Sequence, residues 1–291
     1  MERDYSVGKK ILFVFLGFVA LPAAELLQIV VSLPTIMVVL AKAAAENPGS
    51  IKSILQQFLR RLLDGTLNDA VSVVYAAAAI VGFGLWFFFV FRKDHGPILR
   101  GRHFSIGALL GILIFVVGLQ FLCEIVVMGT EKFIPGALEQ YEELMELAGF
   151  NEPSPLIYLY GILIGPIAEE LIFRGVMLHY FKRAMPFFLA NILQAVLFGI
   201  YHLNIVQGVY AFVMGMIFGA VMRTGRSIFY SILAHISFNA LGFTEVLNYG
   251  ADTWWYYYLW MPVMVLCLVL GLILYFERMN RVNAAVFSPP R

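Results

Sequence analysis

Two adjacent carboxylates and a guanidinium stand inside an otherwise apolar stretch of this sequence. The stretch runs from Pro155 to Phe181 and contains Glu169, Glu170 and Arg174. A charge near the centre of a bilayer costs about 2.5–3.5 kcal/mol on insertion scales, so an ionisable residue there indicates a functional site by default. Glu170 and Arg174 are four residues apart on one helix face and could neutralise each other. Because Glu169 is rotated by about 100° from Glu170, it cannot share that partner equally, and one carboxylate is left over.

Two further pairs of residues in later apolar stretches could supply partners for Glu169. Phe198 and His202 are spaced i, i+4, and so are His235 and Asn239, which puts each pair on one helix face. Alone, a histidine or asparagine in a membrane helix usually joins helices through a hydrogen bond. Together with a surplus glutamate, however, two imidazoles and an amide are the groups that activate water and stabilise an oxyanion.

These residues carry a resemblance to a known family, the CAAX prenyl endopeptidases and bacteriocin-processing enzymes (the CPBP or Abi family of intramembrane proteases). The family motifs EExxxR, FxxxH and HxxxN or HxxxD occur here as Glu169–Arg174, Phe198–His202 and His235–Asn239. All three stand in family order on three expected spans, and the ordered set is far more specific than any single motif. The resemblance covers about residues 155–247, and the earlier spans match only in hydropathy.

The resemblance implies peptide-bond hydrolysis within the membrane. It implies that Glu169 is the general base that activates water, that His202 helps to hold the water, and that His235 and Asn239 stabilise the oxyanion. It also implies that Glu170, Arg174 and Phe198 shape the site. A carboxylate that is removed from water is a better proton acceptor, which agrees with the role of Glu169.

The metal requirement stays open at this stage. A catalytic zinc ion accepts two histidines and a carboxylate and leaves one position for water, and this sequence could supply that set. The same residues can activate water without a metal ion, and the sequence contains no HExxH metalloprotease signature. The cofactor is therefore unknown, with a divalent metal such as zinc as one possibility. The candidate ligands are Glu169, His202 and His235.

Two other classes of function compete with a protease. In a non-catalytic membrane scaffold or immunity protein the polar cluster would only hold helices together. Such a protein would be expected to lack at least one motif residue, whereas all of them are present here. An ion or proton transporter could use the same groups as a relay. That class predicts internal repeats, which the sequence lacks. An aspartyl protease is disfavoured because no aspartate falls within an expected span.

Composition indicates an integral, multi-pass membrane protein. Of 291 residues, 61% are hydrophobic and 13% are charged, whereas soluble domains have roughly 45–50% apolar and 25% charged residues. The net charge of +1 offers no cationic surface for nucleic acid, so the expected partners are membrane lipid and a peptide or protein substrate, lipidated or not. The two cysteines are expected to be small buried hydrophobes.

The expected fold class is all-α, a single membrane domain over residues 1–291 with about eight transmembrane helices. The 41–69 segment is expected to hold an amphipathic surface helix, and the acidic 129–153 segment another. The basic loops alternate along the chain, so the positive-inside bias favours two cytoplasmic termini, although the basic 41–69 segment argues the other way. The expected spans lie near residues 11–40, 70–91, 105–127, 156–180, 186–202, 206–222, 228–243 and 254–276.

Overall fold

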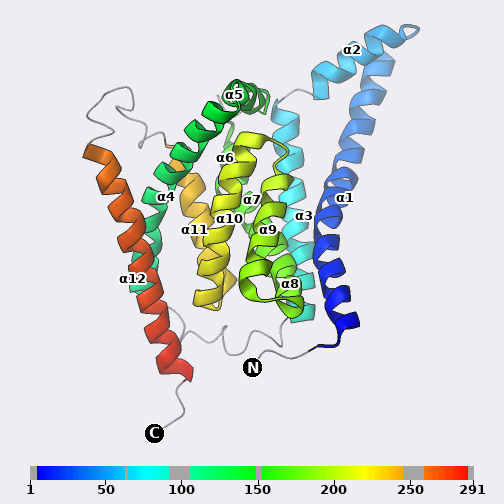
Figure 1. Ribbon diagram of the computed structural model, residues 1–291. Helices are drawn as coiled ribbons and strands as arrows, with labels where there is room; N and C mark the ends of the chain where they lie inside the picture. The colour runs from blue at the N-terminus through cyan, green and yellow to red at the C-terminus, as the bar shows by residue number, and fades with distance from the viewer. Residues whose placement is uncertain (1–4, 63–64, 92–104, 149–152, 245–258, 288–291) are drawn as a thin grey trace.

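The computed structural model describes residues 5–62, 65–91, 105–148, 153–244 and 259–287, and all the regular structure there is helical (Figure 1). The expected class of polytopic helical membrane protein is confirmed. The α-helices are α1 (Val7–Glu46), α2 (Ile51–Leu62), α3 (Gly65–Phe91), α4 (Ile106–Phe133), α5 (Ala137–Leu147), α6 (Pro155–Tyr158), α7 (Gly165–Glu170), α8 (Leu178–Ala184), α9 (Phe187–Tyr201), α10 (Ile205–Gly225), α11 (Ile228–Gly242) and α12 (Met261–Phe287). Two π-helical segments are η2 (Leu159–Ile164) and η3 (Leu171–Met177).

Among the described residues, six helical stretches are long and apolar enough to cross a membrane, and two further apolar helices are shorter. The short helices are α9 and α11, with 15 residues each. At 1.5 Å per residue they extend about 22 Å, less than the roughly 30 Å thickness of a hydrocarbon core. The expected number of about eight spans is therefore approximate. His202 directly follows α9, and His235 lies in α11.

The N-terminal helix is longer than the sequence predicted. Pro22 and Pro34 interrupt the apolar stretch, which predicts a kink, or a span followed by an interfacial segment. In the structure α1 continues as one helix of 40 residues through both. Neighbouring helices and local adjustments allow a membrane helix to accommodate proline. The expected amphipathic helix is α2, which is joined to the end of α1 by an ion pair in which Arg61 Nη2 lies 2.8 Å from Glu46 Oε2.

The C-terminal helix packs closely on α4 through glycines. A Cβ atom at Gly118 of α4 would lie 2.3 Å from the backbone oxygen of Met264 in α12, and one at Gly271 of α12 would lie 2.3 Å from the backbone nitrogen of Phe115. Small residues let membrane helices approach at backbone distance, where van der Waals packing is strongest. This contact fixes α12 against the half of the bundle that holds α11.

A buried aspartate joins α3 to the start of the broken helix formed by α6, η2, α7, η3 and α8. Asp69 lies within α3, although the sequence placed no aspartate inside a span. It is 3% exposed and accepts a hydrogen bond from the Ser154 hydroxyl. The same hydroxyl oxygen accepts from the backbone N–H groups of Leu156 and Ile157 and caps the first turn of α6. The link therefore fixes where the chain enters the segment that carries Glu169.

The ends of the bundle are distinct (Figure 1). Helix α1 begins and α12 ends at the lower end of the view, whereas α5 lies across the upper end. Helix α5 is the expected acidic surface helix, shorter than the 129–153 segment because α4 extends to Phe133. The cytoplasmic placement of the termini stays a prediction. The sequence also predicts that the aromatic residues 254–258 lie at the headgroup interface, but they are outside the described residues.

Candidate active site

The adjacent glutamates Glu169 and Glu170 occupy different environments. Glu170 is fully buried, and its Oε1 atom lies 2.8 Å from Nη1 of the equally buried Arg174. The side chain of Glu169 is 18% exposed and lines a cavity. Successive positions on a helix are about 100° apart, so one carboxylate can pair within the protein while the next faces an open space. The ion pair that the i, i+4 spacing suggested is thus present, and Glu169 is the carboxylate that solvent can reach.

Proline and π-helical geometry set the backbone around Glu169. In η2 the Gly165 N–H reaches back five residues to the Tyr160 carbonyl. In the same register the Gly161 carbonyl would accept from residue 166, but Pro166 has no N–H. The free carbonyl instead accepts a hydrogen bond from Asn239 Nδ2 at 2.7 Å. The break at Gly165-Pro166 therefore ties the glutamate segment to α11, and it uses one N–H of the asparagine that was predicted to stabilise the oxyanion.

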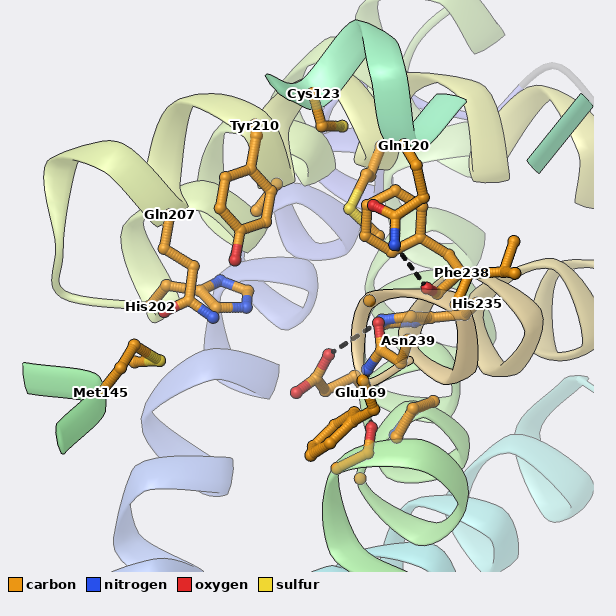
Figure 2. Close-up of a pocket in the computed structure, with 18 of the residues that line it drawn as sticks. Gln120, Cys123, Met145, Glu169, His202, Gln207, Tyr210, His235, Phe238 and Asn239 are labelled. Atoms are coloured by element: carbon orange, nitrogen blue, oxygen red, sulfur yellow. Dashed lines mark hydrogen bonds and ion pairs between the residues drawn. The ribbon is translucent and has the colours of Figure 1, made fainter. Parts of the chain in front are cut away.

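His235 connects the two glutamates. Its Nδ1 atom is 3.0 Å from Glu170 Oε1, and its Nε2 atom is 3.6 Å from Glu169 Oε2. An ionised carboxylate can only accept, so Nδ1 carries a proton that it donates to Glu170. Nε2 then faces Glu169, and this approach is favourable when Nε2 is also protonated or when one water donates to both atoms. Figure 2 shows the ring and the carboxylate directed toward each other.

His202 reaches the same cavity from the end of α9. Its Nδ1–H donates to the Phe198 carbonyl at 2.8 Å, which leaves Nε2 as the atom available to a substrate or water. The Phe198 ring packs edge-on against the His202 ring with centroids 4.9 Å apart. The Arg174 guanidinium carbon lies 4.4 Å from the centre of the same Phe198 ring. Phe198 thus packs against both the histidine ring and the buried guanidinium.

The cavity has a volume of about 1040 Å³ (Figure 2). The structure brings Glu169, Phe198, His202, His235 and Asn239 to its wall, while Glu170 and Arg174 lie behind it. The roles of these residues stay predictions. Residues of both hydrophobic clusters of the bundle line the cavity, so it lies where the two clusters meet.

Several polar residues on this wall were not assigned to the site from the sequence. The intramembrane carboxylates Glu25 and Glu124 gave a signal, because an ionisable residue at membrane depth indicates a function by default. The tyrosines gave none, because aromatic residues are ordinary packing material in membrane helices. Burial raises the pKa of Tyr141 in α5, so its hydroxyl stays neutral. The polar lining residues are Glu25, Gln28, Gln120, Glu124, Tyr141, Tyr158, Tyr160, Tyr201, Gln207 and Tyr210.

The donor geometry does not fit a metal ion. Within the described part of the chain, no three His, Cys, Asp or Glu side chains approach closely enough to hold one. Glu169 and His235 approach each other, but Nδ1 of His235 is already hydrogen-bonded to Glu170. Among the described residues, His202 does not form a set of three metal ligands with them. The proposed steps of the reaction therefore use only the side chains of these residues.

The fold and the site define a polytopic helical membrane protein with a carboxylate and imidazole centre inside its bundle. The family model "Type II CAAX prenyl endopeptidase Rce1-like" matches residues 151–241, which include all three motifs. The segment that carries the motifs is therefore similar to this family of CAAX prenyl endopeptidases, in agreement with the resemblance found in the sequence.

One curated relative matches part of this chain. A Bacillus subtilis (strain 168) protein named "Putative membrane peptidase YdiL" is 27% identical over 109 residues. The match covers 38% of this chain and 45% of the relative, so the chain spans less than half of that protein's length. No solved structure matches the chain.

Proposed function

We propose that this protein is an intramembrane endopeptidase in which Glu169 activates the water that hydrolyses a peptide bond. The observation that carries the proposal is the approach of Glu169 Oε2 to His235 Nε2, 3.6 Å apart at the wall of a cavity inside the bundle. A single water can hydrogen-bond both atoms at that separation. The family of the matched segment supports the same activity.

The reaction proceeds through a tetrahedral intermediate. Glu169 takes a proton from the water, and the resulting hydroxide oxygen bonds to the carbonyl carbon of the substrate while the C=O electron pair moves onto the oxygen. The second N–H of Asn239 and a protonated His235 Nε2 are donors for that oxyanion. Glu169 then transfers its proton to the leaving amide nitrogen, the C–N bond breaks, and a carboxyl and an amine product form.

The buried residues keep this centre in place. The ion pair of Glu170 with Arg174 neutralises both charges, and Glu170 also fixes the tautomer and direction of His235 through Nδ1. Preorganised donors are more effective than mobile ones because they need no reorganisation during the reaction. The substrate is a membrane-associated peptide or protein, either a prenylated CAAX-type chain cut near its C-terminus or another such peptide.

The test is cleavage of a quenched fluorescent peptide library, lipidated and unlipidated, by detergent-purified protein. Glu169→Gln keeps the side-chain volume and removes the base, so kcat should fall about 10²–10⁴-fold, the usual contribution of general acid–base catalysis. The matched control is Glu277→Gln, which removes an exposed carboxylate from α12, outside the cavity. A chelator arm tests for a metal requirement. Equal cleavage by the wild type and Glu169→Gln would exclude the proposed base, and cleavage by neither would favour the scaffold or transporter class.

A further inference from the structure

A pair of tyrosine hydroxyls joins α3 to the end of α9, beside the candidate active site. The hydroxyl oxygens of Tyr75 in α3 and Tyr201, the last residue of α9, are 2.8 Å apart. Tyr201 lines the cavity and directly precedes His202. Tyr75 is 4% exposed and lies behind the cavity wall. The reaction proposed above uses neither hydroxyl.

The burial of Tyr75 sets the direction of this hydrogen bond. Each hydroxyl has one proton, and the bond between them uses only one of the two protons. Within the described part of the chain, the Tyr201 oxygen is the only hydrogen-bond partner of the Tyr75 hydroxyl. If Tyr201 were the donor, the Tyr75 O–H would stay buried without an acceptor, which is costly. Tyr75 therefore donates to Tyr201, and Tyr201 keeps its own proton for another acceptor.

The free O–H bond of Tyr201 has its acceptor in the cavity. Among the described residues, no acceptor besides Tyr75 is within hydrogen-bond distance of the Tyr201 hydroxyl. The carboxylate of Glu169 interacts electrostatically with both hydroxyls, and its negative charge favours an O–H bond that points toward it. The Tyr201 ring is held edge-on against the rings of Phe173 and His202, with centroids 5.4 and 5.9 Å away. Tyr201 is thus a fixed donor beside the proposed base.

The proposed oxyanion has few donors without Tyr201. Asn239 uses one of its two N–H bonds on the Gly161 carbonyl, at 2.7 Å. The Nδ1 proton of His235 goes to Glu170, so Nε2 can donate only when the ring is doubly protonated. When Glu169 accepts the proton of the water, its own charge is neutralised and the negative charge moves to the substrate oxygen. A donor that faced the carboxylate is then attracted to the oxyanion.

We propose that the Tyr201 hydroxyl donates a hydrogen bond to the carbonyl oxygen of the scissile bond, and that Tyr75 is a positioning residue that directs this donor into the cavity. The inference rests on the proposed protease function and adds a catalytic residue to its site. The proton stays on the Tyr201 oxygen throughout, so the bonds that form and break in the reaction are unchanged. Because the substrate oxygen carries most negative charge in the tetrahedral intermediate, the hydrogen bond acts mainly on kcat.

The test compares kcat and KM of the wild type, Tyr201→Phe, Tyr75→Phe and the double variant on a cleaved peptide. In Tyr201→Phe we expect kcat to fall about 10²-fold, as for the loss of one oxyanion donor, with a much smaller change in KM. The fall in Tyr75→Phe should be smaller, because the donor remains but loses its fixed direction. The double variant should equal Tyr201→Phe, since Tyr75 acts only through that hydroxyl. Losses that multiply, as for independent sites, would overturn the role of Tyr75.

The matched control removes a hydroxyl from a similar hydrogen bond outside the cavity. The Tyr180 hydroxyl accepts from Trp86 Nε1 at 3.1 Å and so joins α8 to the same helix α3. Tyr180 is 5% exposed and does not line the cavity. Tyr180→Phe therefore loses the same atom from a buried contact between helices, but it should keep the kcat of the wild type. Equal falls in kcat for Tyr180→Phe and Tyr201→Phe would overturn the inference.

Binding distinguishes a failure of this inference from a failure of the proposed function. Rhodamine-labelled peptides are titrated into detergent-purified Glu169→Gln and Glu169→Gln/Tyr201→Phe, and fluorescence anisotropy is recorded. We expect Kd to rise about threefold or more in the double variant, which lacks one hydrogen bond to the peptide. Cleavage by the wild type with an unchanged kcat in Tyr201→Phe would overturn this inference and leave the protease in place.

The remaining outcomes are equally decisive. Weaker binding by Glu169→Gln/Tyr201→Phe without cleavage by the wild type would support the contact of Tyr201 with the peptide and overturn the protease. Neither cleavage nor a difference in binding would overturn both. If Tyr201→Phe fails to fold, Tyr75→Phe provides the test, because its kcat should still fall below that of Tyr180→Phe.

Discussion

Replacing each of the two adjacent glutamates by glutamine should produce opposite results. In Glu170→Gln the buried guanidinium of Arg174 loses the carboxylate 2.8 Å away, and His235 loses the anion that receives its Nδ1 proton. Removal of one partner from a buried ion pair usually costs about 3–5 kcal/mol, because the other charge stays buried without compensation. The cation–π contact of Arg174 with Phe198 persists, but a contact of this kind contributes only about 2 kcal/mol in a desolvated site.

The same substitution at Glu169 should have little effect on stability. This side chain is 18% exposed, and its ion-pair partner among the described residues, His235 Nε2, is 3.6 Å away. We expect the free energy of unfolding to change by less than about 1 kcal/mol, while kcat falls at least a hundredfold. The two variants make the same chemical change at neighbouring positions. One should lose activity and the other stability, so together they distinguish the catalytic carboxylate from the structural one.

The assay is unfolding in mixed micelles with increasing SDS, followed by intrinsic tryptophan fluorescence, together with kcat/KM on a cleaved peptide. A loss of 3–5 kcal/mol lowers the folding equilibrium constant by about two to four orders of magnitude. The double variant Glu170→Gln/Arg174→Met should regain at least half of the lost stability, since no unpaired charge remains buried. The reasoning would be refuted if Glu170→Gln were as stable as the wild type, or if Glu169→Gln lost as much stability as its neighbour.

Two further predictions concern the backbone. Pro166→Ala restores an N–H that can compete for the Gly161 carbonyl, so Asn239 loses its anchor. We expect kcat/KM to fall about tenfold or more, since small displacements of catalytic groups are costly, while thermal stability in detergent stays unchanged. Full activity of this variant would contradict the role of the anchor. Gly118→Ala brings a Cβ atom to 2.3 Å from the α12 backbone and should destabilise the protein by about 1–3 kcal/mol or more in the SDS titration. Its control, Gly129→Ala on the same helix, meets no atom within 4 Å and should leave stability unchanged or raised; equal behaviour of the two would count against close packing of α4 on α12.

Much of the architecture could be predicted from local patterns. Long apolar stretches require helices in a membrane, because only a helix satisfies every backbone group within one segment. The amphipathic pattern of α2 and the acidic pattern of α5 were likewise visible, since a helix face depends only on spacing. The course of α1 through Pro22 and Pro34 was not, because the neighbours that support a proline-containing helix are distant in sequence.

The sequence by itself determined the class of the protein, the three motifs and the pairing of Glu170 with Arg174, because composition and i, i+4 spacing are local properties. Only the tertiary structure decided that His235, 65 residues from Glu170, stands between the two glutamates, and that Glu25 shares their cavity. The physical reason is that contacts between helices depend on how whole helices rotate and tilt against one another. Those angles follow from packing over the entire bundle, including the break at Pro166, and no single stretch of sequence contains them.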